Sequence, residues 1–456
     1  MKRSAELYLD QWKKRNNRKP LIIRGARQVG KTYLVRSFAK KFENLIEINF
    51  ERYPELAELF SSNEPAEIIG LLGLHFGTQI KEGSTLLFLD EIQAKPEILS
   101  TLRYFYEDMA NLHVIAAGSL LEFALEQPAF SMPVGRIEYL FLGPMQFEEY
   151  LAATGNDALV QFLNEFILNN KIPEVIHHQF IKHLRTFMVT GGMPEVVKRF
   201  CQTDSWQECE IVKNSIVSTF QNDFNKYGKR MDSDVLYDLF RKIPVQVGQK
   251  FKYVNINRYQ RAAVTGKALE LLCHAKVVNK IHHSSGNGIP LGAEINHRKF
   301  KTIFLDVGLM ATICGVNFLD LTKAEDILLV NRGAMCEQFI GQHLFYAGKF
   351  YQEPELFYWA REQKSSSAEV DYLVGSQSLV IPVEVKAGSG SSLKSLHAFV
   401  KMKNRKLGIR FNSDVPSILD TATSLANMDS IPFRLLSLPL YMVGQTKRLR
   451  DEAVRL

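Results

Sequence analysis

An eight-residue loop near the N-terminus sets the first limit on how this chain folds. It matches the pattern GxxxxGK[ST] and lies between a short apolar segment, residues 20–24, and a segment with helical periodicity, residues 31–41. Glycine lets such a loop curl so that its backbone N–H groups face an anion, and the following helix turns the positive end of its dipole toward the same anion. The sequence therefore predicts a strand–loop–helix unit that binds phosphate through Gly25, Ala26, Arg27, Gln28, Val29, Gly30, Lys31 and Thr32.

Two side chains at the end of this loop indicate a nucleoside triphosphate with its metal ion. The Lys31 ammonium would neutralise the β- and γ-phosphates, and the Thr32 hydroxyl would fill one ligand position of Mg²⁺. A merely structural glycine turn is a weak alternative, because the strand before the loop and the helix after it are both expected. We therefore expect ATP and Mg²⁺ as the cofactors.

A pair of acidic residues supports the same chemistry. Residues 86–89 are all apolar and predict a buried strand, whose carboxyl end delivers Asp90 toward the water shell of the metal. Glu91 then lies where a base can orient the attacking water. Alone, such a pair is commonly a solvated strand end, but here it follows Lys31 within one series of strands and helices. The pair favours hydrolysis and argues against a small-molecule kinase.

Ser119 and Arg136 are further candidates for this site, each with an alternative role. Ser119 ends the apolar segment 114–118, where its hydroxyl could sense the γ-phosphate or hold the water, or could instead cap the helix that follows. Arg136 could supply positive charge to the transition state, within its own chain or in a neighbouring one, or could be an exposed, solvated arginine. The sequence leaves both choices open.

The order of apolar segments predicts an α/β fold that begins with a parallel sheet covered by helices on both faces. Strands are expected at 20–24, 45–50, 85–90 and 113–117, and helices at about 31–41, 55–60, 66–77 and 97–109. The first domain is expected to be a P-loop ATPase domain at residues 1–150.

The rest of the chain is expected to form two more domains. Residues 151–330 predict a helical region with a β-hairpin around 286–288, reminiscent of a winged helix. Residues 331–456 predict a mixed α/β domain, with a helix at 333–347 and strands at 356–359, 370–374 and 379–385.

The order of the motifs resembles the prokaryotic AAA+-type ATPases that carry a C-terminal domain of uncharacterised function. The resemblance covers nearly the whole chain and rests on residues 24–32, 87–91, 102–107, 117–122, 135–149, 191–195 and 304–309. It implies that residues 1–150 form an AAA+-type domain that binds ATP and hydrolyses it. Because such enzymes often place their catalytic arginine across a subunit boundary, a homo-oligomer is also an expectation. The physiological substrate does not follow from the resemblance.

A second group of charged residues lies in the C-terminal third. Residues two apart in a strand share a face, so Glu384 and Lys386 point the same way, and Asp371 lies on the strand before them. Together they could hold a divalent ion and activate a water for phosphodiester cleavage.

This D…ExK arrangement resembles the restriction-endonuclease-like (PD-(D/E)xK) fold, in which a glutamate on the preceding helix often joins the metal site. Glu337 is the matching position here. The resemblance implies Glu384 and Lys386 as catalytic residues and Glu337, Asp371 and Glu384 as metal ligands. An exposed ion pair is the alternative, and such domains can keep the fold and serve only for binding.

Positive charge is distributed unevenly within the net charge of +7. The first 41 residues hold 13 Lys or Arg and only two acids, and a second basic stretch with no acid lies between Glu384 and Asp414. A uniformly basic nucleic-acid binder would have a different distribution. The second stretch could contact the phosphates of DNA or RNA, or could form a solvated helix face.

Composition places the chain among folded, soluble proteins, with 46% hydrophobic and 23% charged residues. Its five cysteines are odd in number and lack CxxC spacing, which argues against a disulfide framework and a zinc site and indicates the cytoplasm. We expect no signal peptide and no association with a membrane, because no apolar run approaches the length that a bilayer requires.

Two hypotheses of function follow. In the first, an ATPase couples nucleotide binding and hydrolysis to a nuclease-like C-terminal domain that acts on nucleic acid. In the second, ATP gates a regulatory switch whose C-terminal domain is an inert module that binds a partner.

Overall fold

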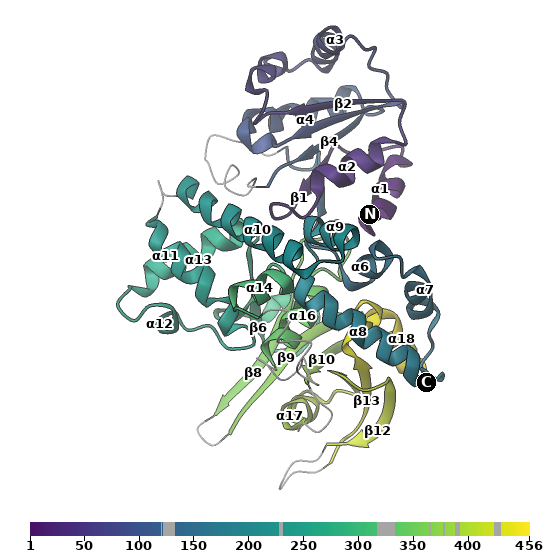
Figure 1. Ribbon diagram of the computed structural model, residues 1–456, viewed down its shortest axis with the longest axis vertical. Helices are drawn as coiled ribbons and strands as arrows, with labels where there is room; N and C mark the ends of the chain where they lie inside the picture. The colour runs from purple at the N-terminus through teal and green to yellow at the C-terminus, as the bar shows by residue number, and fades with distance from the viewer. Residues whose placement is uncertain are drawn as a thin grey trace.

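Two β-sheets and a layer of helices between them make up the molecule (Figure 1). The computed structural model describes residues 1–119, 121, 133–227, 231–316, 333–363, 366–376, 379–387, 393–423 and 430–456. The N-terminal sheet lies at the top of Figure 1, the C-terminal sheet at the bottom, and the helices of the middle region separate them.

The N-terminal sheet has five strands in the order β2-β3-β4-β1-β5, and every neighbouring pair is parallel. The strands are β1 (Leu21–Arg24), β2 (Asn44–Asn49), β3 (Thr85–Asp90), β4 (His113–Ala117) and β5 (Glu138–Phe141). The α/β class, the parallel sheet and the first four strands are confirmed. The sequence did not indicate β5, a four-residue edge strand that is only half buried.

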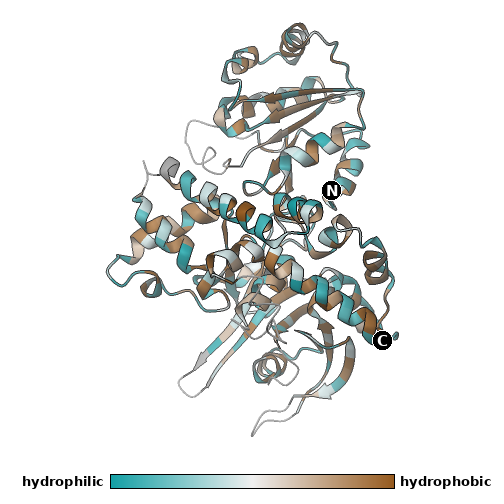
Figure 2. Cartoon of the chain, viewed as in Figure 1, coloured by the Kyte–Doolittle hydropathy of each residue, from teal (hydrophilic) through white to brown (hydrophobic). Residues whose placement is uncertain are grey.

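Both faces of this sheet are covered, as the continuous apolar strands require. Alternate residues of one strand enter different cores: Leu21 and Ile23 pack on one side, and Ile22 packs on the other. The central strands β3, β4 and β1 are accordingly mostly hydrophobic in Figure 2. The covering elements are α1 (Ala5–Lys13), α2 (Lys31–Ala39), η1 (Pro54–Phe60), α3 (Pro65–Phe76), η2 (Ile92–Ala94), η3 (Pro96–Thr101) and α4 (Leu102–Asp108).

The middle region is mainly helical, as predicted. Its helices are α6 (Phe147–Ala153), α7 (Asp157–Glu165), α8 (Glu174–Thr190), α9 (Pro194–Thr203), α10 (Trp206–Tyr227), α11 (Ser233–Lys242), η4 (Pro244–Gln246), α12 (Tyr253–Ile256), α13 (Ala262–His274) and α14 (Val307–Ile313). Among the described residues, no helix combines the length and the apolar character needed to cross a membrane.

The C-terminal sheet is mixed and has eight strands in the order β12-β13-β11-β10-β9-β8-β6-β7. They are β6 (Val278–Ser284), β7 (Ile295–Phe304), β8 (Phe357–Gln363), β9 (Ser366–Ser376), β10 (Leu379–Val385), β11 (Leu407–Asn412), β12 (Ser417–Ala422) and β13 (Pro432–Pro439). The other elements near it are η5 (Leu291–Glu294), α16 (Ala334–Phe345), α17 (Lys394–Lys403), η7 (Leu440–Gln445) and α18 (Thr446–Arg455).

The hairpin expected around 286–288 is formed by β6 and β7, but it extends the C-terminal sheet. The extension is a parallel pairing of β6 with β8 at His282–Phe357 and His283–Tyr358. Strand pairing therefore crosses residue 330, and the division into domains 1–150, 151–330 and 331–456 stays a prediction.

A cluster of aromatic rings joins the middle helices to the C-terminal domain. Phe147 of α6, Phe187 of α8 and Phe339 of α16 lie with ring centroids 5.7 to 6.2 Å apart in edge-to-face pairs. Such pairs contribute about 0.5–1.5 kcal/mol each beyond the area they bury. The same apolar core includes Trp12 near the N-terminus and Ile381 of β10, so it runs through the whole molecule.

Candidate functional site

The predicted phosphate-binding loop runs from the carboxyl end of β1 to the first turn of α2, and two of its glycines cannot easily be replaced. A Cβ atom on Gly25 would lie 2.2 Å from the backbone oxygen of Leu142. Gly30 has a φ of 93°, which side-chain-bearing residues rarely adopt. Ala26 and Val29 are buried in the core and Gln28 is exposed, so the loop passes from the core to the surface and back.

Lys31 is folded back into the loop. Its Nζ donates hydrogen bonds to the backbone oxygens of Gly25 at 2.9 Å and Ala26 at 2.8 Å. Burial lowers the pKa of this ammonium to about 8, although the charges of Glu91 and Asp90 oppose that shift. The ammonium is thus held at the loop by neutral oxygens, which an arriving phosphate could replace.

Thr32 and Asp90 meet across the gap between α2 and β3. The Thr32 hydroxyl donates to Oδ2 of Asp90 at 3.0 Å. Burial, followed by the neighbouring charge of Glu91, raises the pKa of Asp90 to about 6. A hydroxyl and a carboxylate are the hard oxygen donors that Mg²⁺ prefers, so the pair fits the metal that the sequence predicts.

Glu91 has an uncommon backbone conformation for its residue type. Its φ is 50°, in the left-handed region that non-glycine residues enter rarely and that is typical of functional sites. Oε2 accepts hydrogen bonds from Nε2 of Gln93 at 2.6 Å and from the hydroxyl of Ser119 at 3.4 Å. The turn therefore aims the carboxylate at the carboxyl end of β4.

Ser119 lies between Glu91 and an arginine of the loop. Nε of Arg27 donates to the Ser119 hydroxyl at 3.3 Å, and its Nη1 donates to both carboxylate oxygens of Asp223 in α10 at 2.7 and 2.8 Å. The structure thus places Ser119 beside the loop, and its role toward the γ-phosphate stays a prediction. The alternative, that Ser119 caps a helix, involves segment 122–132, which lies outside the described residues.

Arg136 lies at the opposite edge of the sheet from the loop. The register pairs Leu21 with Glu138, so Arg136 precedes the amino ends of these parallel strands, whereas the loop follows their carboxyl ends. Its Nε instead donates to Glu107 at 2.7 Å on an exposed surface. Within one chain Arg136 does not face the loop, and its action on a neighbouring chain stays a prediction.

The C-terminal charged residues also converge. Oδ2 of Asp371 in β9 accepts from the backbone N–H of Val385 at 2.8 Å, and Nζ of Lys386 lies 2.7 Å from Oε1 of Glu384 in β10. Glu337 of α16 lies close to the same place, where burial and the charges of Asp371 and Glu384 raise its pKa. The structure thus brings these four side chains together, and their role as a site stays a prediction.

A residue that the sequence analysis missed stands among them. Lys301 of β7 is only 2% exposed, and its Nζ lies 2.5 Å from Glu369, 3.7 Å from Glu337 and 3.7 Å from Asp371. No three His, Cys, Asp or Glu side chains of the described residues are placed to share a metal ion. This arrangement therefore does not support the predicted metal site at Glu337, Asp371 and Glu384, because an ammonium lies among the carboxylates.

The carboxyl groups of this cluster are hard to ionise. Burial, and after it the charge of Asp371, raises the pKa of Glu337 to about 8 and that of Glu384 to about 7. The lysines compensate only part of this effect.

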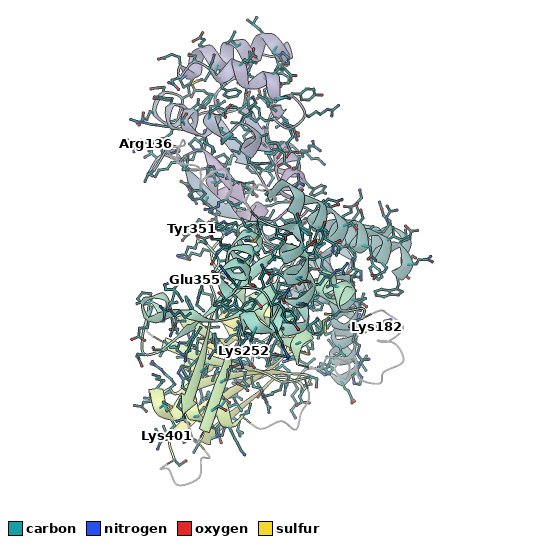
Figure 3. All side chains as sticks on the ribbon, turned by 90° about the vertical axis from the view of Figure 1, so that its left-hand side faces the viewer. Arg136, Lys182, Lys252, Tyr351, Glu355 and Lys401 are labelled. Carbon is teal, nitrogen blue, oxygen red and sulfur yellow. The ribbon has the colours of Figure 1, made fainter. Side chains whose placement is uncertain are left out.

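The second basic stretch is not a single solvated helix face. It runs through α17 into β11, where Nζ of Lys403 donates to Asn287 at 2.6 Å and Arg405 donates to the backbone oxygen of Gly286 at 2.9 Å. Some of its positive charge thus anchors the β6–β7 hairpin. Figure 3 places Lys401 of this stretch and Arg136 at opposite ends of the molecule.

Comparisons with known families divide the chain into three segments. Residues 17–151 match the family described as AAA domain. The N-terminal domain is an AAA-type P-loop domain. Residues 181–320 and 332–427 match two domains of unknown function, DUF8612 and DUF4143. The endonuclease-like assignment of the last segment therefore remains a resemblance.

Individual proteins similar to this chain are distant. An uncharacterized protein of Methanocaldococcus jannaschii is 27% identical over 203 residues, which span 42% of this chain and 41% of that protein. This chain thus matches less than half the length of its curated relative.

Two solved structures show a low similarity to this chain. The ORC2 protein of Aeropyrum pernix, in ADPNP–ADP complexes, has a TM-score of 0.33 and 12% identity over 68% of this chain and 91% of its own. AMPPCP-bound DnaA of Aquifex aeolicus has a TM-score of 0.28 and 12% identity over 59% of this chain and 87% of its own. These TM-scores are too low to indicate a shared function.

The AAA domain is fastened to the middle helices at its phosphate-binding loop. The guanidinium of Arg3 is buried and donates to the backbone oxygens of Val29 and Gly143, both at 2.8 Å, and to Glu149 of α6 at 3.1 Å. No motif identifies Arg3 or Asp223, because each finds its partner far away in the sequence.

A second connection leads from the AAA domain toward α16. Gly30 lies so close to Pro194 that an added Cβ atom would be 3.3 Å from its ring. The backbone N–H of Gly192 donates to Asp306 at 2.7 Å, and the amide of Gln342 in α16 donates to the same carboxylate at 3.4 Å. The motifs at 191–195 and 304–309 thus lie between the loop and the helix that carries Glu337.

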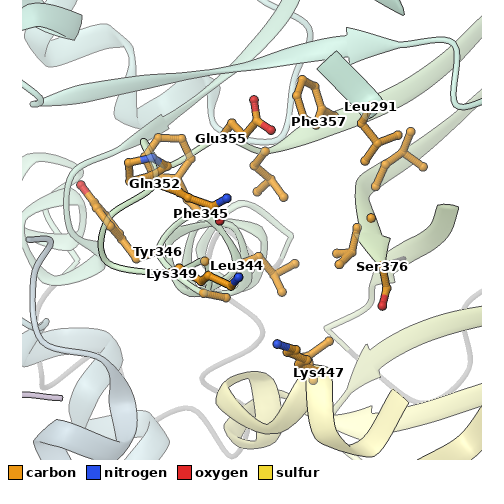
Figure 4. A pocket seen from close by; sticks show the side chains of 18 of the residues that line it. Leu291, Leu344, Phe345, Tyr346, Lys349, Gln352, Glu355, Phe357, Ser376 and Lys447 are labelled. Carbon is orange, nitrogen blue, oxygen red and sulfur yellow. The ribbon is translucent and has the colours of Figure 1, made fainter. Parts of the chain in front are cut away.

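The molecule also has a cavity of about 920 Å³ that the sequence did not indicate. It opens between the end of α16, the β6–β7 connection and α18, and Leu344, Tyr346, Ser376 and Lys447 are among its lining residues (Figure 4). None of the predicted site residues lines it.

Proposed function

We propose that this protein binds MgATP at the loop Gly25–Thr32 and hydrolyses it. The observation that carries the proposal is the contact of Thr32 with Asp90 beside a lysine that is held by neutral oxygens inside the loop. When bound by Thr32 and Asp90, Mg²⁺ would supply positive charge to the triphosphate. Lys31 would exchange its two backbone partners for phosphate oxygens.

Glu91 would act on the attacking water. Its left-handed backbone and its contacts with Gln93 and Ser119 hold the carboxylate in one place. Hydrolysis joins the water oxygen to the γ-phosphorus and breaks the bond from that phosphorus to the bridging oxygen, which leaves with ADP and the bonding electron pair. Glu91 would take the proton of the water, and Ser119 would help to orient it.

The test separates binding from hydrolysis. Glu91→Gln should keep the affinity for a fluorescent ATP analogue and lower phosphate release by about 100-fold or more. Glu97→Gln is the matched control, since Glu97 follows the same strand but is exposed. If Glu91→Gln hydrolyses ATP as fast as the wild type, the role assigned to Glu91 is wrong.

We infer that ATP gates a switch whose C-terminal domain is an inert module for binding a partner. Lys301 among the carboxylates favours this function over the coupled nuclease. If Asp371→Ala and Lys386→Ala keep the cellular effect that Lys31→Ala abolishes, the switch is supported. Metal-dependent cleavage of DNA or RNA by the wild type, lost in Glu384→Ala, would establish the nuclease instead.

Two contacts of the loop could carry nucleotide state outward. Arg27 is bound to Asp223 of α10, and Gly30 packs on Pro194 of α9. A phosphate that draws Arg27 away would release α10, and one that shifts Gly30 would press on the connection through Gly192 and Asp306. This is the route by which we expect the AAA domain to influence α16.

We also propose partners and a cellular location for this protein. The basic stretch supports contact with DNA or RNA, and Arg136, exposed at the far edge of the AAA domain, supports action across a subunit boundary in a homo-oligomer. All five cysteines are free thiols, which supports a reducing compartment, the cytoplasm.

A further inference from the structure

The C-terminal cluster brings several carboxyl groups close together, each of them buried or half-buried. Four carboxyl side chains come together from α16, β9 and β10, namely Glu337, Glu369, Asp371 and Glu384. They form ion pairs with two ammonium groups, those of Lys301 and Lys386. Buried carboxylates of one sign need a cation in their midst. The PD-(D/E)xK resemblance expects that cation to be a divalent metal.

We propose that Lys301 is the resident cation of this cluster, so that the wild-type C-terminal domain takes no divalent metal there, and that removing its ammonium opens a divalent cation site. The claim concerns only this cluster and does not rest on ATP hydrolysis by the AAA domain.

The position of Lys301 supports this assignment. Its Nζ reaches carboxylates from two different elements, Glu337 of α16 and Glu369 and Asp371 of β9. The ring of Tyr358 in β8 lies 5.4 Å from the same nitrogen and adds a cation–π contact. A side chain that is 2% exposed and surrounded in this way leaves little room for a second cation.

The remaining oxygens show what a metal would find if the ammonium were absent. Among the described residues, Oε2 of Glu384, Oε2 of Glu337 and Nζ of Lys301 have no hydrogen-bond partner, and Glu384 is only 3% exposed. Lys301 is thus held by the charges of its neighbours and not by regular hydrogen bonds. A lysine offers three N–H donors and a single charge, whereas a divalent ion accepts six or more oxygen ligands. In the wild-type arrangement the acidic side chains are not placed to share an ion, so a metal would use this acceptor capacity only when they close into the space that the ammonium leaves.

The chemical consequence is a loss of Lewis acidity. A bound divalent ion lowers the pKa of its water and produces a nucleophile at neutral pH, and an ammonium ion does not. A domain with Lys301 in place keeps its fold and its charge balance without the means to activate water. This agrees with an inert binding module.

The experiment counts bound Mn²⁺ by electron paramagnetic resonance in nucleotide-free, full-length protein. All variants carry Asp90→Asn, which removes the metal ligand of the AAA domain. The parent should bind no Mn²⁺ that depends on Asp371. Lys301→Met should gain one Mn²⁺ per chain, and Lys301→Met with Asp371→Asn should lose it again.

Lys280→Met is the matched control. Lys280 lies on β6, next to the residue that pairs with Lys301, and its ammonium contacts Glu270 and not the cluster. It should gain no Mn²⁺, although it removes the same charge from the same hairpin.

Two results would overturn the proposal. One is a parent protein that binds Mn²⁺ and loses it through Asp371→Asn, which would mean that Lys301 does not exclude the metal. The other is a folded Lys301→Met variant, checked by circular dichroism, that gains no Mn²⁺. Should Lys301→Met fail to fold, Lys301→Gln replaces it, and the comparison of the parent with Asp371→Asn still decides the first point.

Discussion

The AAA domain and the C-terminal cluster each bury a lysine, and the two lysines have opposite surroundings. Lys31 is 7% exposed and donates to two neutral backbone oxygens, and burial lowers its pKa to about 8. Lys301 is 2% exposed and lies among three carboxylates. Burial acts against its charge too, but Glu337, Asp371 and Glu369 outweigh it and raise its pKa above the ordinary value.

The difference shows that a fold can bury an ammonium group either without an ion pair or together with carboxylates that pair with it. An ammonium whose hydrogen bonds go to neutral oxygens is stabilised when an anion arrives, so Lys31 is prepared for a phosphate. An ammonium that faces carboxylates already has its counter-charges, so Lys301 serves the structure. Exchanging either lysine for methionine, which has a similar shape, tests this contrast.

The largest expected effect is on stability. Lys301→Met leaves buried carboxylates without their cation and should lower the free energy of unfolding by about 3–5 kcal/mol. Lys31→Met removes a buried charge that has no carboxylate contact and should cost less than about 1 kcal/mol. Urea unfolding followed by tryptophan fluorescence, to which the buried Trp12 of α1 and the buried Trp359 of β8 both contribute, reports on both sheets. A larger loss in Lys31→Met would contradict the contrast.

The C-terminal cluster and Lys31 should contribute to the pH dependence of stability with opposite signs. Glu337 and Glu384, with pKa values raised to about 8 and about 7, keep protons in the folded state that the unfolded state has already lost. Their contribution to stability should therefore fall as pH rises from about 5 to 8, by at most about 1.4 kcal/mol per pH unit for each proton.

The contribution of Lys31 has the opposite sign above pH 8. Its folded pKa of about 8 lies below the ordinary 10.5, so the unfolded state binds more protons and this contribution rises with pH between these values. Urea titrations of each variant and of the wild type at a series of pH values measure the two contributions as differences. Glu337→Gln should remove a contribution that falls with pH below pH 8, and Lys31→Met should remove one that rises above pH 8; the opposite result in either variant would show that the assignment is wrong.

A smaller effect concerns the arginine of the loop. Asp223 holds Arg27 with two hydrogen bonds, and a phosphate would have to compete with it. Asp223→Asn should therefore strengthen ATP binding by about 3- to 10-fold, which corresponds to an ion pair of about 1 kcal/mol. Fluorescence titration measures the affinity, and weaker binding in Asp223→Asn would mean that the pair stabilises the binding-competent loop.

The parts of the fold that the sequence predicted are those with a strong local signal. β3 is six apolar or buried residues in a row, and the glycine loop must lie between a strand and a helix. The sequence did not indicate β5, because an edge strand of four residues has no such run. It predicted the hairpin β6–β7 but not its pairing with β8, because the sequence does not reveal which strand pairs with which.

The candidate sites follow the same rule. Thr32 and Asp90 meet because two motifs fix them at the same edge of a parallel sheet, and those motifs predicted both residues as parts of one Mg²⁺ site. Asp223 and Lys301 could not be foreseen, because each is an ordinary residue in its own segment and gains its role only from tertiary contacts. Both were therefore missed, and Lys301 changes the interpretation of the C-terminal domain.

Calorimetric titration of ATP in the presence of Mg²⁺ into wild type, Lys31→Met and Lys301→Met tests the central claim most directly. We expect one saturable site per chain in the wild type and in folded Lys301→Met, and affinity reduced by about 100-fold or more in Lys31→Met, because only Lys31 faces the phosphates. Absence of saturable binding in the wild type, or equal binding in Lys31→Met, would contradict the account.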